Sequence, residues 1–83
     1  MKTTKKQLAN FAIGLVKETS KYNSIYCVRY ETSRINIILY RDLLKNDYEI
    51  ICIDLKDDLK TNKDKFKKAI LKIRGIKLWK ENY

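Results

Sequence analysis

The side chains with the most chemistry to offer in this chain are its lysines, which gather towards the two ends. Residues 1–23 carry five lysines against one glutamate, and residues 60–83 carry nine basic residues against two acidic ones. Residues 24–59, between them, carry five basic and seven acidic residues. Because an ammonium group neutralises a phosphate and releases counterions whatever the base sequence, such clusters favour polyanionic partners.

A set of basic residues in these two segments forms the candidate nucleic-acid interface. Only four of the 19 basic residues are arginines, so bidentate reading of bases in the major groove is not expected. Binding should therefore rest on phosphates and on shape. The candidate residues are Lys63, Lys65, Lys67, Lys68, Lys72, Arg74, Lys77 and Lys80, helped by Lys6, Lys17 and Lys21.

Codon usage in an A/T-rich genome is the alternative explanation of these lysines. Phe, Tyr, Met, Ile, Asn and Lys together number 41, whereas Gly, Ala, Arg and Pro number nine. Such a bias would place lysine instead of arginine on an ordinary solvated helix face. It does not explain why the middle of the chain is acidic.

Few residues could support catalysis. The chain has no histidine, which removes the usual acid–base shuttle and the histidine-activated nucleophiles. The Asp-Leu-Lys run at 54–56, with Glu18, resembles part of the metal site of restriction-endonuclease-type nucleases. That family's further metal-binding Asp should lie at the start of the second strand, where this chain has Arg34 and Asn36. We therefore predict a protein that is not an enzyme and has no cofactor.

The two cysteines, Cys27 and Cys52, both fall in apolar runs of the sequence. Buried free thiols are the expected state of such residues, and a disulfide or a redox role is the alternative. Two cysteines without histidine cannot supply the usual ligands of a structural zinc site, so no metal is expected.

A first helix is predicted over residues 4–22, where apolar side chains recur at helical spacing and Thr4 followed by Gln7 fits a capping box. Lys6 and Lys17 project from the opposite face. The expected buried stripe comprises Leu8, Phe11, Ala12, Leu15, Val16, Thr19 and Tyr22, widened by Ala9 and Ile13.

A second helix is predicted to be capped by Thr61 or Asn62 and to end at Gly75. Lysines border its apolar stripe on both sides. After Gly75, residues 76–83 alternate weakly, so they could form a short last strand or a docked extension. The stripe comprises Phe66, Ala69, Ile70 and Ile73.

Three runs rich in β-branched and aromatic residues, at 25–30, 35–40 and 48–55, are predicted strands. The two-residue link Thr32-Ser33 suits a hairpin that sets Glu31 opposite Arg34. The second link is longer and contains the turn-forming Asn46 and Asp47. Both links are too short for a crossover, so the strands are expected to pair antiparallel.

The predicted fold is a single α+β domain over residues 1–83, of α-β-β-β-α order, with two helices on one face of a three-stranded antiparallel sheet. A short fourth strand at the C-terminus is an open alternative. The strands are apolar on both faces, but two helices cover only one face. The other face needs either the 76–83 tail or another protein chain. A homodimer or a protein partner docked on the sheet is therefore an open alternative.

This order of elements is similar to that of double-stranded-RNA-binding domains. In that family a lysine cluster at the start of the second helix contacts phosphates across the groove. Lys63, Lys65, Lys67 and Lys68 lie in the corresponding place. The family's Gly-Pro and histidine-bearing hairpin signature is missing, so the resemblance is one of topology and does not imply membership.

Tyrosines give a second route to nucleic acid, because sheet aromatics can stack on single-stranded bases. Tyr26 and Tyr30 share one face of the first predicted strand, and Tyr40 or Tyr48 could lie nearby. Filling of the core is the alternative role for these rings.

The function we expect is that of a non-catalytic, small basic protein that binds nucleic acid or a nucleoprotein complex through lysine-rich helices, as an accessory protein of a phage or mobile element. The alternative is a protein-binding inhibitor, anti-CRISPR-like or another blocker of a host complex, that acts through the sheet face or the basic surface. A cytoplasmic location is expected, because no apolar run approaches the ~18 residues that span a membrane and Asn10 interrupts the only signal-like stretch.

Overall fold

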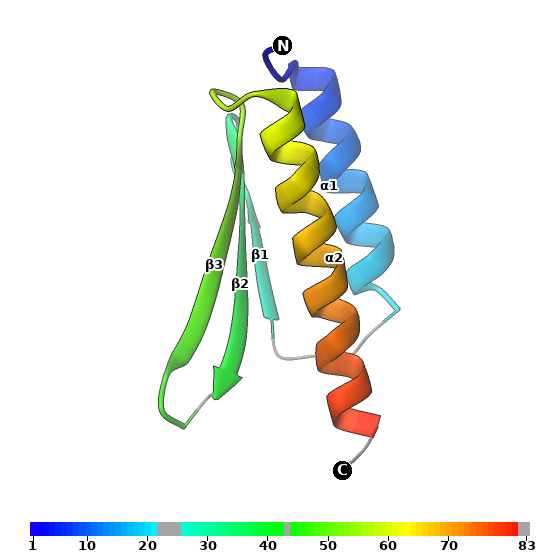
Figure 1. Cartoon of the computed structure of the whole chain (residues 1–83), viewed down its shortest axis with the longest axis vertical. Coiled ribbons are helices and arrows are strands. Elements are labelled where there is room, and N and C mark those ends of the chain that lie inside the picture. Colours follow the sequence, from blue (N-terminus) through cyan, green and yellow to red (C-terminus); the bar gives the residue numbers. More distant parts are fainter. Residues whose placement is uncertain (22–25, 43, 82–83) are drawn as a thin grey trace.

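The computed structural model describes residues 1–21, 26–42 and 44–81. Two helices and three strands follow one another along the chain: α1 (Lys5–Thr19), β1 (Tyr26–Tyr30), β2 (Arg34–Asp42), β3 (Asp47–Asp54) and α2 (Leu59–Glu81). The strands form one antiparallel sheet in the order β1-β2-β3. Both helices lie on the same face of this sheet, side by side and running in the same direction (Figure 1). The predicted α-β-β-β-α fold is confirmed.

The core lies between the sheet and the two helices. Because side chains alternate along a strand, every second residue of β2 and β3 points to the helices. The helices are joined to each other by the rings of Phe11 and Phe66, whose centroids are 5.3 Å apart. The buried apolar residues are Leu8, Leu15, Ile35, Ile37, Leu39, Ile51, Ile53, Ala69 and Ile73.

Helix α1 begins as predicted, because Thr4 accepts the N–H of Gln7 at 3.2 Å and the Gln7 side chain accepts the N–H of Thr4 at 2.8 Å. Its buried stripe was predicted partly wrongly. Leu8 and Leu15 are buried, but Val16 and Ile13 are 52% and 54% exposed. The charged Glu18 is buried in their place. The reason is that α2 packs on the Glu18 side of α1, which turns the other edge of the stripe outward. The helix also ends at Thr19 rather than at residue 22, and the predicted position of Tyr22 lies outside the described residues.

The turns agree with the predicted strand pairing. Arg34 Nε lies 3.2 Å from Glu31 Oε2, and the Glu31 N–H donates to the Arg34 carbonyl at 2.9 Å. Asn46 takes the left-handed conformation, with φ of 53°, in the turn between β2 and β3. Asparagine tolerates this conformation better than most residues. The β1–β2 turn lies at the same end of the molecule as the N-termini of both helices (Figure 1).

Helix α2 is longer than the sequence predicts. It begins at Leu59, because Asp58 accepts the N–H of Lys60 at 3.2 Å and acts as the cap. It then continues through Gly75 to Glu81, so the predicted end at Gly75 is wrong and residues 76–81 form neither a strand nor an extension over the sheet. A Cβ at Gly75 would meet nothing within 4 Å, and an isolated glycine costs a helix only about 1 kcal/mol. Neither helix of the described chain combines the length and apolar content that crossing a membrane requires.

Candidate nucleic-acid interface

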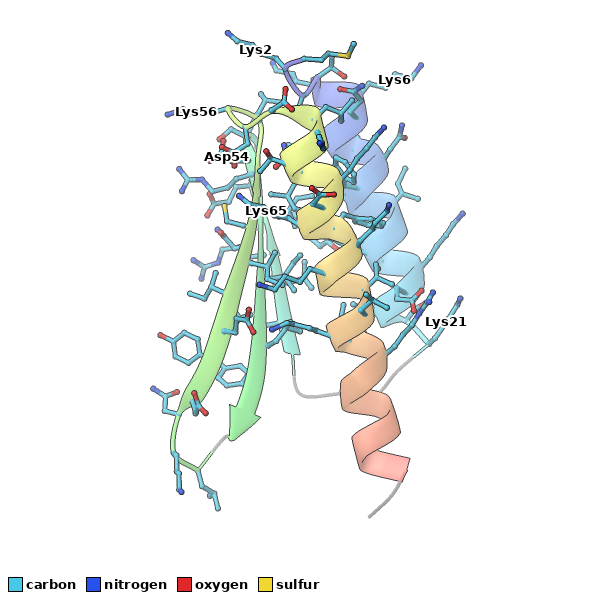
Figure 2. The ribbon with its side chains drawn as sticks, viewed as in Figure 1. Lys2, Lys6, Lys21, Asp54, Lys56 and Lys65 are labelled. Atoms are coloured by element: carbon cyan, nitrogen blue, oxygen red, sulfur yellow. The ribbon has the colours of Figure 1, made fainter. Side chains whose placement is uncertain are left out.

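The lysines of α2 that face the sheet are paired with carboxylates. Lys65 Nζ lies 2.9 Å from Asp57 Oδ2, in the loop before the helix. Lys68 Nζ lies 3.4 Å from Glu49 Oε1, and Lys72 forms an ion pair with the same glutamate on β3. Lys65 can be seen on the sheet side of α2 in Figure 2. These three predicted binding residues therefore have part of their charge compensated within the protein.

Glu49 is the anion that holds two of these lysines. The hydrogen bond from Lys72 lowers the pKa of the Glu49 carboxyl, and partial burial opposes this while Lys68 adds to it. The carboxyl is therefore ionised at neutral pH and attracts both ammonium groups to the sheet. A phosphate that approached these two lysines would have to compete with Glu49.

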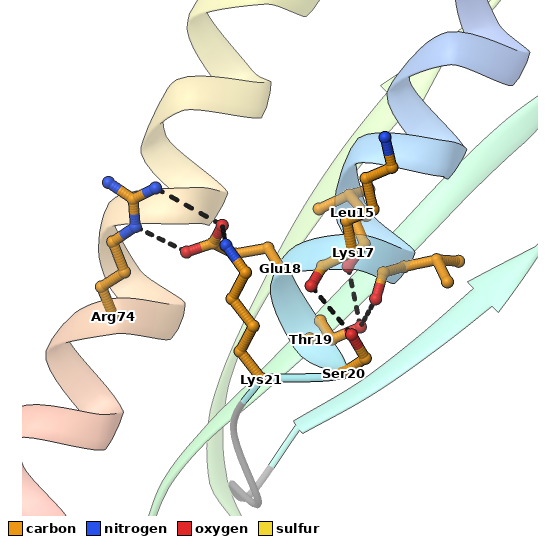
Figure 3. A network of polar contacts seen from close by, with 8 residues as sticks. Leu15, Lys17, Glu18, Thr19, Ser20, Lys21 and Arg74 are labelled. Atoms are coloured by element: carbon orange, nitrogen blue, oxygen red, sulfur yellow. Dashed lines mark hydrogen bonds and ion pairs between the residues drawn. The ribbon is translucent and has the colours of Figure 1, made fainter.

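A second carboxylate, Glu18, pairs with basic residues between the two helices. Arg74 Nε lies 2.5 Å from Glu18 Oε1, and Lys21 Nζ lies 3.9 Å from Glu18 Oε2 (Figure 3). The Thr19 hydroxyl donates to the Leu15 carbonyl at 2.7 Å and closes the last turn of α1 beside this pair. Two of the predicted binding residues, Lys21 and Arg74, thus share one buried carboxylate.

Four predicted residues remain without such compensation: Lys6 and Lys17 on α1, and Lys63 and Lys67 on α2. All four are exposed, and none of the carboxylates whose side chains the structure describes forms an ion pair with them. We call this set the outer lysine face.

Helical geometry places the outer lysine face on the side of the helices that points away from the sheet. Lys63 and Lys67 are one turn apart, and Lys6 and Lys17 are three turns apart. The lysines of α1 therefore span about 16 Å along the helix axis. In Figure 2, Lys6 and Lys21 point away from the sheet. Because the helices run parallel and touch at Phe11 and Phe66, the two pairs of lysines flank one shared surface.

Lysines that the sequence analysis omitted extend this face. Lys60 is exposed and belongs with Lys63 and Lys67 by their spacing of three and four residues, a signal that the sequence contains. Lys2 lies at the end of the molecule where both helices begin, whereas Lys56, at the same end, points to the sheet side and away from Lys6 (Figure 2). Lys2 is placed there because it forms a β-bridge with Asp58, a long-range contact that no local pattern in the sequence predicts. Lys77 and Lys80 fall in the last turns of α2, and their side chains lie outside the described part of the chain.

Asp54 and Glu18, the acidic residues considered for a nuclease-like metal site, each have other partners. Asp54 lies opposite Arg34 in the sheet and accepts the N–H of Lys56 at 2.9 Å. Glu18 is held by Arg74 instead. The described residues include no group of three His, Cys, Asp or Glu side chains that could hold a metal.

Both cysteines are free, as predicted, but they are not buried. Cys27 is exposed and Cys52 is half-buried, because they lie on the face of the sheet that the helices leave open. Partial burial raises the pKa of the Cys52 thiol, with Asp54 adding to the rise, so the thiol stays protonated at neutral pH.

The exposed tyrosine rings belong to the strands of the sheet, and one of them, Tyr30, lies beside a lysine of the outer lysine face. Tyr40 and Tyr48 form a cross-strand pair with centroids 5.7 Å apart, on the face opposite the helices. Tyr30 is exposed at the other edge of the sheet, beside Val16 of α1. The side chain of Tyr26 lies outside the described residues. The Tyr40–Tyr48 pair is thus separate from the outer lysine face, whereas Tyr30 borders that face at Lys17.

Comparisons with known proteins identified no relative: no protein-family model, curated protein or solved structure matches this chain. The similarity to double-stranded-RNA-binding domains remains one of element order. What the protein does is therefore inferred from its own surface.

Proposed function

We propose that this protein is a non-catalytic, cytoplasmic nucleic-acid-binding protein that contacts phosphates through the outer lysine face. The observation that carries the proposal is the division of the lysines. Carboxylates of the protein compensate Lys65, Lys68 and Lys72, whereas no carboxylate among the described side chains pairs with Lys63 or Lys67 on the same helix. Uncompensated ammonium groups on a rigid surface release counterions when they meet phosphates, and this release drives binding.

The chemistry of the face indicates how it would bind. It offers lysines, and the nearby Arg74 is paired with Glu18, so bidentate base recognition is not expected. The rings of Phe11 and Phe66 are packed on each other between the helices, and the exposed ring of Tyr30 lies beside Lys17 at one border of the face. Because Tyr30 offers one ring against four lysines, binding would depend on the backbone of a duplex more than on stacking with single-stranded bases. The A/T-rich coding and small size suit an accessory protein of a phage or mobile element.

Fluorescence anisotropy tests this proposal directly. Labelled duplex DNA, duplex RNA and single strands would be titrated with the protein over a series of salt concentrations. We expect binding to both duplexes at low salt, with log K falling linearly as log salt rises. The steeper and tighter of the two duplex titrations would identify the substrate class. If no strand binds at low salt, the outer lysine face is only a solvated surface.

A protein-binding inhibitor is the second candidate function, and the open face of the sheet favours it. Ile50 and Tyr48 are 54% and 42% exposed there, which is unusual for large apolar side chains in a contiguous patch. An inhibitor of a host nucleoprotein complex, anti-CRISPR-like in role, could use this face or the lysines. A competition experiment tests this second proposal. If the sheet face is responsible for the inhibition of the host complex, an excess of duplex leaves that inhibition unchanged.

A further inference from the structure

The face of the sheet away from the helices is apolar and uncovered. Both helices lie on the opposite side, and α2 runs on to Glu81 without crossing the sheet (Figure 1). Ile50 is 54% exposed on the edge strand β3, and Tyr48, two residues before it on the same strand, is 42% exposed. We call the surface the outer sheet face; it comprises Cys27, Ile38, Tyr40, Tyr48, Ile50 and Cys52, bordered by Arg29, Asn36 and Asp54.

The few charges on the outer sheet face differ in sign between its two edges. Arg29 lies on β1, level with Asn36, and no described residue forms an ion pair with it. Asp54 lies on β3, level with Arg34, whose charge is already paired with Glu31. One edge of the face is therefore positive and the other negative, at the same end of the strands.

We propose that a second copy of this chain covers the outer sheet face, sheet against sheet, around a two-fold axis that runs along β2. Such an axis places β1 of each copy over β3 of the other. Arg29 of one copy then faces Asp54 of the second copy, and the pair forms twice. Arg29 and Asp54 differ by two residues along the strand, or about 7 Å, and an arginine side chain spans this distance.

The centre of the same arrangement is apolar. Ile38 lies on β2, so the two-fold axis brings it near Ile38 of the second copy. Cys27 pairs with Ile38 in the sheet, and Ile50 pairs with Ile38 from the other side, so one row of three apolar residues crosses all three strands. Two sheets packed in this way lie about 10 Å apart and interdigitate their side chains. The resulting assembly has four layers, with helices outside and sheets inside.

The distribution of charge permits this dimer despite the net charge of +9. The uncompensated lysines lie on the outer lysine face, on the far side of the helices from the sheet. In the proposed dimer, the two outer lysine faces point in opposite directions. They are separated by two sheets and two helix layers, which is much more than the Debye length of about 8 Å at physiological salt. Packing through the helices would instead bring the lysines together.

Sedimentation equilibrium of the full chain tests the proposal with two matched variants. Ile50→Lys alters the outer sheet face, and Ile13→Lys alters an isoleucine of α1 with the same exposure of 54%. We expect the wild-type chain and Ile13→Lys to be dimeric and Ile50→Lys to be monomeric, with circular dichroism confirming that all three are folded. A wild-type chain that stays monomeric up to about 1 mM would overturn the proposal. Disruption of the dimer by Ile13→Lys alone would also overturn it.

Charge reversal gives an independent check of the two-fold geometry that does not depend on Ile50. Arg29→Asp and Asp54→Arg should each weaken the dimer at least about tenfold, because each brings two like charges together. The double variant should recover most of the loss, because it exchanges the two partners. If each reversal has no effect on the dimer, or if the double variant is weaker than both single ones, the proposed axis is wrong. Neither charge reversal, Arg29→Asp or Asp54→Arg, touches the outer lysine face, so the outcome of these two substitutions is separate from that of the nucleic-acid titrations.

Discussion

At the scale of single residues, the lysines of α2 differ in what lies next to them, although they look alike in the sequence. Lys68 and Lys72 reach Glu49 on β3, whereas Lys63 and Lys67 reach no carboxylate of the described residues. The helical spacing alone sorts the lysines by direction. The identity of the facing residue decides which of them retain a free charge for a ligand.

Glu49→Gln should lower the free energy of unfolding by about 0.5–1 kcal/mol at pH 7, because it removes two partly exposed ion pairs. The folded state lowers the pKa of Glu49, so its stabilisation is present above the ordinary pKa of a glutamate and is lost as the pH falls through the lowered value. Urea unfolding of both proteins at several pH values measures this. The difference between them should shrink in acid; a difference that grows in acid would contradict the assigned role of Glu49.

Asn62→Ala should lower the free energy of unfolding by about 1–2 kcal/mol, because it removes two hydrogen bonds, one buried and one partly buried. The Asn62 amide donates to Thr3 Oγ1 at 2.7 Å and to the Asp54 carbonyl at 2.8 Å, and it thereby joins the N-terminal segment, β3 and α2. The control is Thr61→Ala, at the neighbouring exposed position, which should change the stability by less than about 0.5 kcal/mol. Equal effects of the two substitutions in urea unfolding would show that the buried amide is not an anchor.

At the scale of elements, the two parallel helices are the scaffold of the outer lysine face, and their contact fixes its width. Gly14 of α1 allows this contact, because a Cβ at that position would lie 2.8 Å from Cζ of Phe66. Gly75 of α2 has open space around it. The two glycines therefore test the packing of the helices while controlling for helix propensity.

Gly75→Ala should raise the free energy of unfolding by up to about 1 kcal/mol, because alanine favours the helix more than glycine does. Gly14→Ala receives the same gain but forces Phe66 to move against Phe11. Such overpacking lowers the free energy of unfolding by about 1–3 kcal/mol. We therefore expect Gly14→Ala to be less stable than Gly75→Ala by about that amount. Thermal or urea unfolding compares the two proteins. Equal stabilisation by both would show that the helices are not in contact at Gly14.

Local sequence signals predicted most of the elements and missed what tertiary contacts decide. The Thr4–Gln7 capping box, the strand pairing and the Glu31–Arg34 pair follow from spacing that is visible in the chain. The end of α2 was predicted wrongly because glycine is a frequent helix terminator. Residues 76–81 nevertheless continue the helix.

At the scale of the whole molecule, the protein presents two different surfaces. The helices carry the uncompensated lysines together with exposed apolar side chains such as Ile13 and Val16, whereas the outer side of the sheet carries Tyr48 and Ile50 with few charges (Figures 1 and 2). The sequence indicated both surfaces, because the basic segments were read as helices and the strands were apolar on both faces. It could not indicate that Glu49 and Asp57 compensate Lys65, Lys68 and Lys72 of α2, since this depends on how the layers are placed. The proposed dimer would turn these two surfaces into one buried interface and two opposed lysine faces.

The measurement that tests the central claim most directly compares the salt dependence of duplex binding for two double variants of equal net charge. Lys63→Gln with Lys67→Gln removes two lysines of the outer face, and Lys65→Gln with Lys68→Gln removes two that are paired with carboxylates. We predict that the first pair lowers the slope of log K against log salt by about two and weakens binding at low salt. The second pair should change the slope much less. Equal losses in both double variants would show that net charge alone, and not the outer lysine face, governs binding.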